Sequence, residues 1–280
     1  MHWKRYKSMQ TKSLVGMGLQ DVYSDQYWDI VAELNTRATT EMVEAAQSMF
    51  ESANWHKRVM AVHILGEMTL RNPSKNCYQS YAVEQTHEIL CRALRDQCLQ
   101  VVIAALRGLG YRPAPEAVTA IMQYADHPDA QVRKAVAVSL GSYAQNQCLD
   151  VLLRLAADAN DDVRDWATFS LNLICQNGID TPAVRERLWV NMYDTYGEVR
   201  GEAILGLAMR KDPGVTDFLL NKTDVSYYGF CELEAAETLA DPRLYPVLEK
   251  FWNQCSTDND TDIAWLSALR DAMQACQPKE

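Results

Sequence analysis

Three groups of residues in this chain have side chains and a spacing that could support binding or catalysis. In the first group, Asp258, Asp260 and Asp262 alternate like the first ligands of a calcium-binding loop. However, Ile263 stands where such a loop needs glycine, and Leu269 stands where it needs the closing carboxylate. We therefore interpret these aspartates as a solvated cap of the last helix.

His87 and Cys91 are one helical turn apart, a spacing at which two side chains can share a metal ion. The sequence offers no obvious third ligand, so ordinary surface and core roles are favoured. It also lacks the G-x-S-x-G and Walker motifs, and Gly16-Met-Gly18 has no third glycine. We predict that the protein is not an enzyme, with no catalytic, cofactor-binding or metal-binding residues.

A third group, Asp165, Trp166 and Phe169, combines a carboxylate with two aromatic rings. On a helix whose buried face starts at Val163, these three side chains project away from the core. Carboxylates and aromatic faces both bind lysine and arginine side chains. The alternative is that Trp166 and Phe169 pack between neighbouring helices, and the sequence leaves both interpretations open.

An internal repeat determines how such residues are positioned. Three segments align without gaps: VRKAVAVSLG at 132–141, VRDWATFSLN at 163–172 and VRGEAILGLA at 199–208. Weaker copies start at positions 57, 101 and 231, so the interval between copies is 31 to 44 residues. Intervals of this length are typical of stacked helix pairs.

Apolar residues at positions 0, +4 and +8 of each copy mark one face of a helix, and a second amphipathic stretch lies between copies. These partner helices are expected at 82–95, 115–125, 147–157, 182–193, 214–221 and 242–253. Pro182, Pro213 and Pro242 agree, because proline is well tolerated at a helix start. The long first interval predicts an extended connection from Arg71 to Ser80.

The repeat also predicts a candidate partner-binding stripe on the inner surface of the superhelix. Its members occupy the same outward positions of successive second helices. They are Lys134, Asp165, Trp166, Phe169, Glu202, Glu234 and Glu237.

An aspartate in the turn of each pair and an arginine early in its second helix form another regularity. The residues of this ladder are Asp126, Arg133, Asp158, Arg164, Asp194 and Arg200. An arginine fork can bind turn carbonyls and carboxylates of neighbouring repeats, so we interpret these residues as structural. Val102 and Glu232 stand in place of the arginine and predict interruptions at the second and sixth pairs.

The segments VRDWATFSL and VRGEAILGLA resemble HEAT repeats of the kind first named in phycobilin lyases, as found in bacterial proteins of undefined role. The resemblance covers about residues 39–253. It implies an all-α, right-handed α-solenoid, or superhelix, of about six to seven HEAT-like helix pairs. We expect residues 1–36 to form a basic N-terminal arm with a capping helix at 24–35, and residues 37–276 to form a single solenoid domain.

Charge and cysteine content limit the possible partners. The 280-residue chain has a formal net charge of −10, which disfavours binding to nucleic acid or to an anionic membrane. Its eight cysteines include no CxxC pair, and no stretch resembles a signal peptide or a membrane span. We therefore expect a cytoplasmic protein without cofactors whose partner is a basic protein.

These observations favour a non-enzymatic protein-binding module, such as an adaptor, an inhibitor or an immunity protein that neutralises a bacterial toxin domain. Two alternatives come from the resemblance alone. HEAT-like alkylpurine DNA glycosylases use aromatic residues and a carboxylate, as Trp166 and Asp165 could, but the negative charge opposes DNA binding. A lyase or chaperone for a chromophore-bearing protein is the other, although no cysteine stands out for thiol chemistry.

Overall fold

The computed structural model of the chain describes residues 3–72, 77–143, 146–176, 178–222, 224–258 and 260–278. Its internal contacts divide it into two compact units, unit 1 (Met1–Tyr143) and unit 2 (Ala144–Glu280). Each unit is a stack of helix pairs. The chain is thus an α-solenoid, as the repeat predicts.

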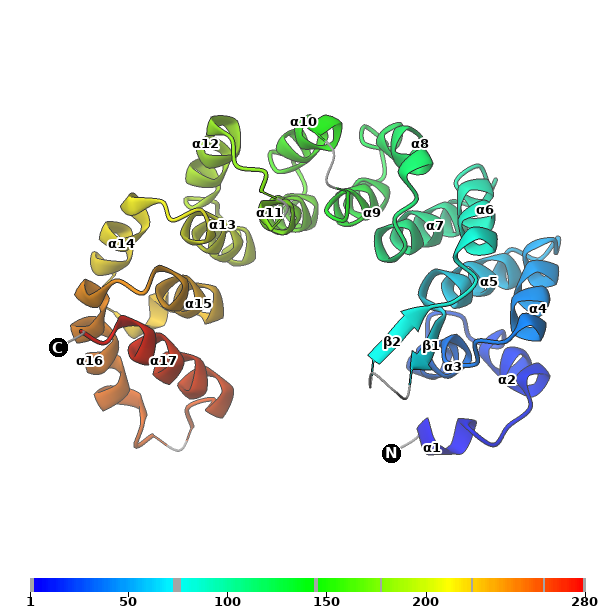
Figure 1. The fold of residues 1–280 in the computed structure, drawn as a ribbon, viewed down its shortest axis with the longest axis horizontal. Helices are drawn as coiled ribbons and strands as arrows, with labels where there is room; N and C mark the ends of the chain where they lie inside the picture. The colour runs from blue at the N-terminus through cyan, green and yellow to red at the C-terminus, as the bar shows by residue number, and fades with distance from the viewer. Residues whose placement is uncertain are drawn as a thin grey trace. The chain divides into compact units, whose positions relative to one another are not determined.

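Unit 1 consists of helices and one small hairpin (Figure 1). The second helices of its pairs, α5, α7 and α9, pack on one another in one layer, and α4, α6 and α8 form the other. The helices are α1 (Trp3–Tyr6), α2 (Thr11–Gly18), α3 (Asp25–Asn35), α4 (Thr40–Phe50), α5 (Trp55–Glu67), α6 (Val83–Ala93), α7 (Leu99–Tyr111), η1 (Pro115–Ala117), α8 (Val118–Met122) and α9 (Ala130–Leu140).

Unit 2 repeats the two-layer arrangement with first helices α10, α12, α14 and α16 and second helices α11, α13, α15 and α17 (Figure 1). Across the described residues this gives seven helix pairs, α4/α5 to α16/α17, in agreement with the predicted number. The elements are α10 (Asn146–Leu155), α11 (Asp161–Cys175), α12 (Pro182–Asn191), α13 (Gly197–Met209), α14 (Pro213–Leu220), η2 (Val225–Tyr227), α15 (Phe230–Leu239), η3 (Pro242–Leu244), α16 (Tyr245–Cys255) and α17 (Ile263–Cys276).

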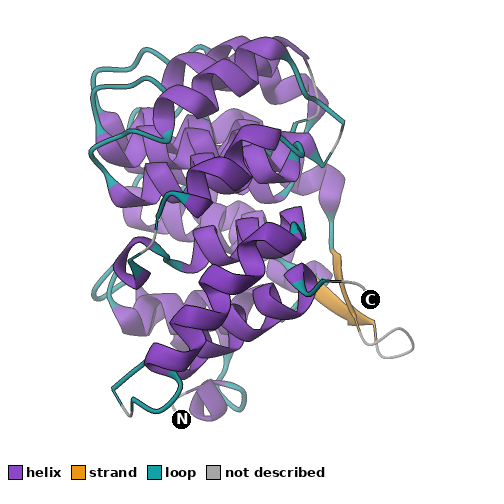
Figure 2. Ribbon diagram, turned by 90° about the vertical axis from the view of Figure 1, so that its left-hand side faces the viewer, coloured by secondary structure: helices purple, strands orange, loops and turns teal. Residues whose placement is uncertain are grey.

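The extended connection predicted in the first interval is a β-hairpin. Strand β1 (Thr69–Asn72) pairs antiparallel with β2 (Cys77–Ser80), and Thr69 lies opposite Ser80. Figure 2 shows this hairpin as the strand-containing part of an otherwise helical set of described residues. The hairpin accounts for the extra length of the first interval.

Capping residues and prolines start the helices at the positions that the sequence indicates. The side chains of Asn160 and Thr181 accept hydrogen bonds from the backbone N–H groups of Val163 (3.2 Å) and Val184 (3.3 Å). Pro182 occupies the first turn of α12, where its missing N–H leaves no helical hydrogen bond unmade.

The buried positions of the repeat form the core of each unit. Val132, Val163 and Val199, which open the three aligned segments, are fully buried. Burying one such side chain contributes about 1.5 to 3 kcal/mol to folding. Gly66 and Gly108 let α5 and α7 approach closely, because a Cβ on Gly66 would stand 3.1 Å from the Cα of Gly108.

The first residues of the chain are packed on unit 1. The capping helix expected at 24–35 is α3, which packs against α5, and α1 and α2 precede it. Arg37 donates to the carbonyls of Tyr6 and Met9, both at 2.8 Å, and to the hydroxyl of Thr11 at 3.2 Å. These hydrogen bonds tie the basic N-terminal segment to the helix that caps the stack.

Within the described ranges, no helix combines the length and the apolar character that crossing a membrane requires.

Candidate functional site

Helix α11 in unit 2 carries the aspartate and the aromatic pair of the candidate stripe. It buries Val163 and Ala167 on its core side. Asp165 and Trp166 are half-buried, and the side chain of Phe169 is 36% exposed. The two rings therefore differ: Trp166 is partly covered, whereas Phe169 reaches the solvent.

Helices α13 and α15 carry the remaining acidic residues of the stripe. Glu202 on α13 is half-buried, and Glu234 and Glu237 on α15 are exposed. Their neighbour Leu233 is fully buried, because α15 packs between α13 and α17. We use the name acidic stripe for the residues that lie on unit 2, which are Asp165, Trp166, Phe169, Glu202, Glu234 and Glu237.

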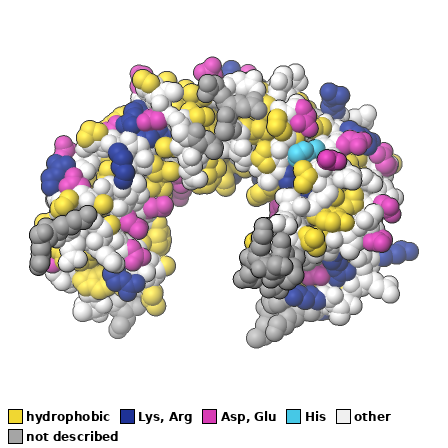
Figure 3. All heavy atoms as spheres, viewed as in Figure 1, with side chains coloured by type: hydrophobic (Ala, Val, Ile, Leu, Met, Phe, Trp, Pro, Cys, Tyr) yellow, Lys and Arg dark blue, Asp and Glu magenta, His cyan; other side chains and the backbone are white. Residues whose placement is uncertain are grey.

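Carboxylates from three successive second helices influence one another in this stripe. Burial raises the pKa of Glu202, a hydrogen bond from Asn172 Nδ2 (3.0 Å) lowers it, and the charges of Asp165 and Glu234 raise it further. Figure 3 shows acidic side chains gathered on the part of unit 2 that the second helices occupy. Such mutual repulsion favours the binding of a cation.

The aromatic pair gives the stripe an apolar part. The rings of Trp166 and Phe169 meet edge to face, with centroids 5.6 Å apart and an interplanar angle of 75°. An exposed ring close to carboxylates can hold the aliphatic stem and the charge of a lysine or arginine at the same time.

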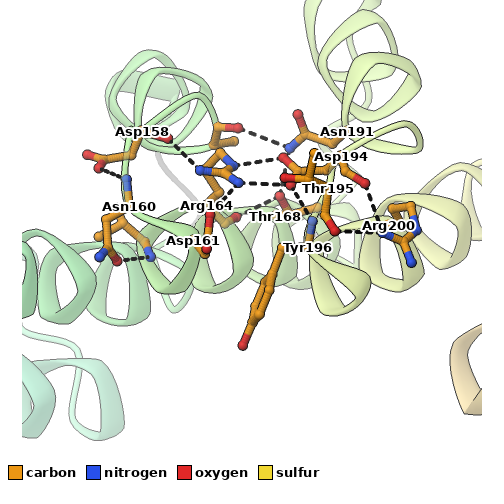
Figure 4. A network of polar contacts seen from close by, with 12 residues as sticks. Asp158, Asn160, Asp161, Arg164, Thr168, Asn191, Asp194, Thr195, Tyr196 and Arg200 are labelled. Carbon is orange, nitrogen blue, oxygen red and sulfur yellow. Dashed lines mark hydrogen bonds and ion pairs between the residues drawn. The ribbon is translucent and has the colours of Figure 1, made fainter.

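Arg164 links two successive turns of unit 2 (Figure 4). Its Nε and Nη2 donate to the two carboxylate oxygens of Asp194 at 2.7 and 2.8 Å, and its Nη1 donates to the Asp158 carbonyl at 3.0 Å. The pKa of Asp194 lies below its usual range, mainly because of the hydrogen bonds from Arg164. We call such a two-bonded arginine–aspartate pair a rung.

A second rung, in unit 1, was not predicted from the sequence. Arg58 donates to both carboxylate oxygens of Asp96, at 2.7 and 2.9 Å. Asp96 stands two residues before Cys98, the N-cap of α7, just as Asp194 stands two residues before the N-cap of α13. The spacing between aspartate and arginine did not indicate Asp96, because Val102 stands where the arginine of that pair would be. The spacing between the aspartate and the N-cap of the next second helix does indicate it.

The ladder arginine of α9 binds its own turn. Arg133 donates to the carbonyls of His127 (2.8 Å) and Pro128 (3.1 Å) in its own turn, and Asp126 is exposed. Lys134 is half-buried on α9.

Arg200 binds turn carbonyls but forms no rung. Its Nη1 donates to the carbonyls of Asp194 (2.9 Å) and Thr195 (3.0 Å). Among the residues that the structure describes, no carboxylate lies within ion-pair distance of Arg200. In the next pair, Glu232 occupies the ladder position and caps α15 by accepting a hydrogen bond from the Gly229 N–H at 2.9 Å.

A cavity of about 140 Å³ in unit 1 was also not predicted. Trp28, His63, Glu67 and Arg107 are among the residues that line it. The Tyr27 hydroxyl lies 2.7 Å from His63 Nδ1, and burial, with a contribution from Arg107, lowers the pKa of His63 to about 4. Since the lining comes from α3, α5 and α7, no single repeat could have indicated it.

Of the three aspartates that imitate a calcium loop, Asp262 caps the last helix, as predicted. Asp262 is the N-cap of α17 and accepts hydrogen bonds from the N–H groups of Ala264 (2.7 Å) and Trp265 (3.1 Å). Asp258 accepts one from the N–H of Asp260 at 3.0 Å. In the described part of the chain, no three histidine, cysteine or acidic side chains are arranged to hold a metal ion.

Comparison with known proteins agrees with this architecture. The family of HEAT repeats matches residues 88–172. This part of the chain therefore consists of HEAT repeats. The protein YibA of Escherichia coli (strain K12) is 28% identical to this protein over 223 residues, which are 77% of this chain and 76% of YibA.

Solved structures show the same fold. The X-ray structure of YibA aligns with a TM-score of 0.69 and 25% identity, covering 98% of this chain and 94% of YibA. The complex of CpcE and CpcF of phycocyanin lyase from Nostoc aligns with a TM-score of 0.50 and 16% identity, covering 96% and 95% of the two chains. The second likeness concerns the fold alone.

Proposed function

We propose that this protein is a non-enzymatic module that binds a basic protein through the acidic stripe of unit 2. The observation that carries the proposal is the mutual influence of Asp165, Glu202 and Glu234, which lie on three successive second helices. A lysine- or arginine-bearing segment that crosses these helices would replace repulsion among carboxylates by attraction.

The aromatic pair supports the same proposal. Phe169 is the exposed member, and its ring stands against Trp166. Aromatic side chains with few rotamers contribute a large share of the binding energy at protein interfaces, particularly where charged neighbours orient the partner. The stripe thus combines an anchor with a charge pattern that selects basic sequences.

Within this class, the net charge of −10 favours an inhibitor or adaptor for a basic partner, such as an immunity protein that neutralises a toxin domain. A toxin-like reading frame beside the gene would support the immunity role. We propose a cytoplasmic location, and the eight cysteines, all free thiols, support it.

The test measures binding of fluorescein-labelled octalysine to the full chain by fluorescence anisotropy at low salt. Replacing three stripe carboxylates (Asp165→Asn, Glu202→Gln and Glu234→Gln) should weaken binding about tenfold, a loss of ~1.4 kcal/mol. The effect should shrink as salt is raised, because exposed charges are screened.

A matched variant separates the stripe from total charge. Asp150, Glu186 and Glu249 are exposed acids on first helices α10, α12 and α16 of the same unit. Their replacement by the corresponding amides removes the same charge and should change octalysine binding less than about twofold. Equal losses in both triple variants would contradict the proposal.

A further inference from the structure

Unit 2 has a pocket of its own, which lies where the pairs α12/α13 and α14/α15 meet. Its volume is about 470 Å³, and Tyr193, Arg200, Phe218, Lys222 and Glu232 contribute to its lining. Tyr193 is 70% exposed, and its ring meets that of Phe218 edge to face with centroids 6.1 Å apart. The pocket therefore has an aromatic wall beside charged groups.

Unlike Arg58 and Arg164, Arg200 has no carboxylate partner in the ranges that the structure describes. Arg58 and Arg164 each place two nitrogens on one carboxylate, at 2.7 to 2.9 Å. Arg200 uses Nη1 alone, on two carbonyls, as Figure 4 shows. Within the described residues its Nε and Nη2 have no hydrogen-bond acceptor, so the pair of nitrogens that makes a rung elsewhere is unused in a residue that lines the pocket.

The turn before α15 explains why the carboxylate is missing. In the rungs, the aspartate stands two residues before the N-cap of the next second helix and accepts the N–H of that N-cap residue. Before α15 the short helix η2 intervenes, and Tyr227 stands two residues before the N-cap Gly229. The aspartate of this turn, Asp224, instead caps η2 and accepts the N–H of Ser226 at 2.9 Å.

The charges around the pocket favour an anion. The Arg200 guanidinium and the Lys222 ammonium are its two cations, and the Lys222 nitrogen lies 5.0 Å from the centroid of the Phe218 ring. The one opposing group among the lining residues is Glu232, whose carboxylate already accepts the Gly229 N–H. A planar carboxylate is the group whose two oxygens match an arginine fork.

We propose that this pocket binds the carboxylate of an aspartate or glutamate side chain on a partner protein, which completes at Arg200 the rung that the chain itself leaves open. The aromatic wall of Tyr193 and Phe218 then contacts an apolar neighbour of that acidic residue. The site is separate from the acidic stripe and does not depend on the role proposed for it.

Two blocked dipeptides, acetyl-Phe-Asp-amide and acetyl-Phe-Asn-amide, test the proposal on the full chain. Binding is followed by NMR through the Nε–H signals of the arginine side chains. The Asp peptide should bind about tenfold more tightly than the Asn peptide, as a charge-assisted bidentate pair implies, and should shift the Arg200 signal. Equal affinities for the two peptides would overturn the proposal.

Variants test whether Arg200 causes the preference for the Asp peptide over the Asn peptide. Arg200→Gln should abolish the preference for the Asp peptide, and Arg200→Lys, which keeps the charge and removes the fork, should reduce it at least about threefold. Arg187→Gln on α12, outside the pocket lining, should leave it unchanged. If Arg200→Gln does not fold, Arg200→Lys decides, because a folded lysine variant with the full preference contradicts the proposal.

Discussion

At the scale of single residues, the rung between Arg164 and Asp194 joins two helix pairs with three hydrogen bonds from one guanidinium. Both side chains are largely shielded, at 13% and 12% exposure, so their attraction is screened less than that of a surface pair. Removing Arg164 takes this counterion from the largely shielded Asp194, and removing Asp194 leaves the Arg164 guanidinium with the exposed Asp161 carboxylate alone, at 2.7 Å.

Replacing Asp194 by alanine should therefore lower the free energy of unfolding by about 2 to 3 kcal/mol, the usual cost of losing hydrogen bonds to a charged group. Urea denaturation followed by circular dichroism measures this loss. Asp217→Ala is the control, because Asp217 pairs with Arg243 at 68% and 57% exposure. That change should stay within about 0.5 kcal/mol, and equal losses would argue against a structural role of the rung.

The burial of His63 should make the stability of unit 1 depend on pH. Burial lowers its pKa to about 4 in the folded protein, below the ~6.5 of an unfolded histidine. As the pH falls, His63 binds a proton in the unfolded chain before it does so in the folded protein. The stability that the buried, neutral His63 contributes is therefore full above pH ~6.5 and is lost as the pH falls toward 4.

His63→Gln should flatten the fall of unfolding free energy between pH 6.5 and 4, about the two pKa values of the group. Denaturant unfolding at a series of pH values compares the variant with the wild type, and the His63 ring signals in NMR should titrate near pH 4. A midpoint near 6.5 would contradict the buried, neutral imidazole.

At the scale of elements, close packing of successive second helices holds the acidic stripe in place. A Cβ on Gly206 of α13 would stand 2.0 Å from Oδ1 of Asn172 on α11. Asn172 also donates to Glu202, so the same contact positions a carboxylate of the stripe.

Gly206→Ala should thus destabilise the protein by about 1 to 3 kcal/mol, because an extra methyl group in a tight contact forces neighbours to move. Gly16→Ala on α2 is the matched control. A Cβ there meets nothing within 4 Å, so helix propensity alone acts and the change should be neutral or stabilising by up to about 1 kcal/mol. Thermal unfolding distinguishes the two, and an unaffected Gly206 variant would contradict the close approach.

The sequence predicted the elements well because each repeat encodes its own helices. Val163 and Val199 marked the buried face, and Pro182 marked a helix start, since these signals lie within one element. The cavity at His63 and the pocket at Arg200 bring together residues from several helices, so no local pattern revealed them.

At the scale of the whole molecule, each unit stacks its second helices and presents residues that change from one pair to the next. On unit 2 these helices carry carboxylates on α11, α13 and α15 and the exposed ring of Phe169. In the function that we propose, a partner is selected by a pattern of charges along several helices rather than by one deep pocket.

Site-specific photocrosslinking in the source cell tests this claim most directly. p-Benzoylphenylalanine would replace Phe169 on α11 in one experiment and Val190 on α12, an exposed apolar residue of a first helix, in the other. We expect crosslinks from position 169 to a lysine- or arginine-rich segment of one protein, and few from position 190. Equal yields at the two positions, or crosslinks from 169 to acidic segments only, would contradict the acidic stripe as the binding surface.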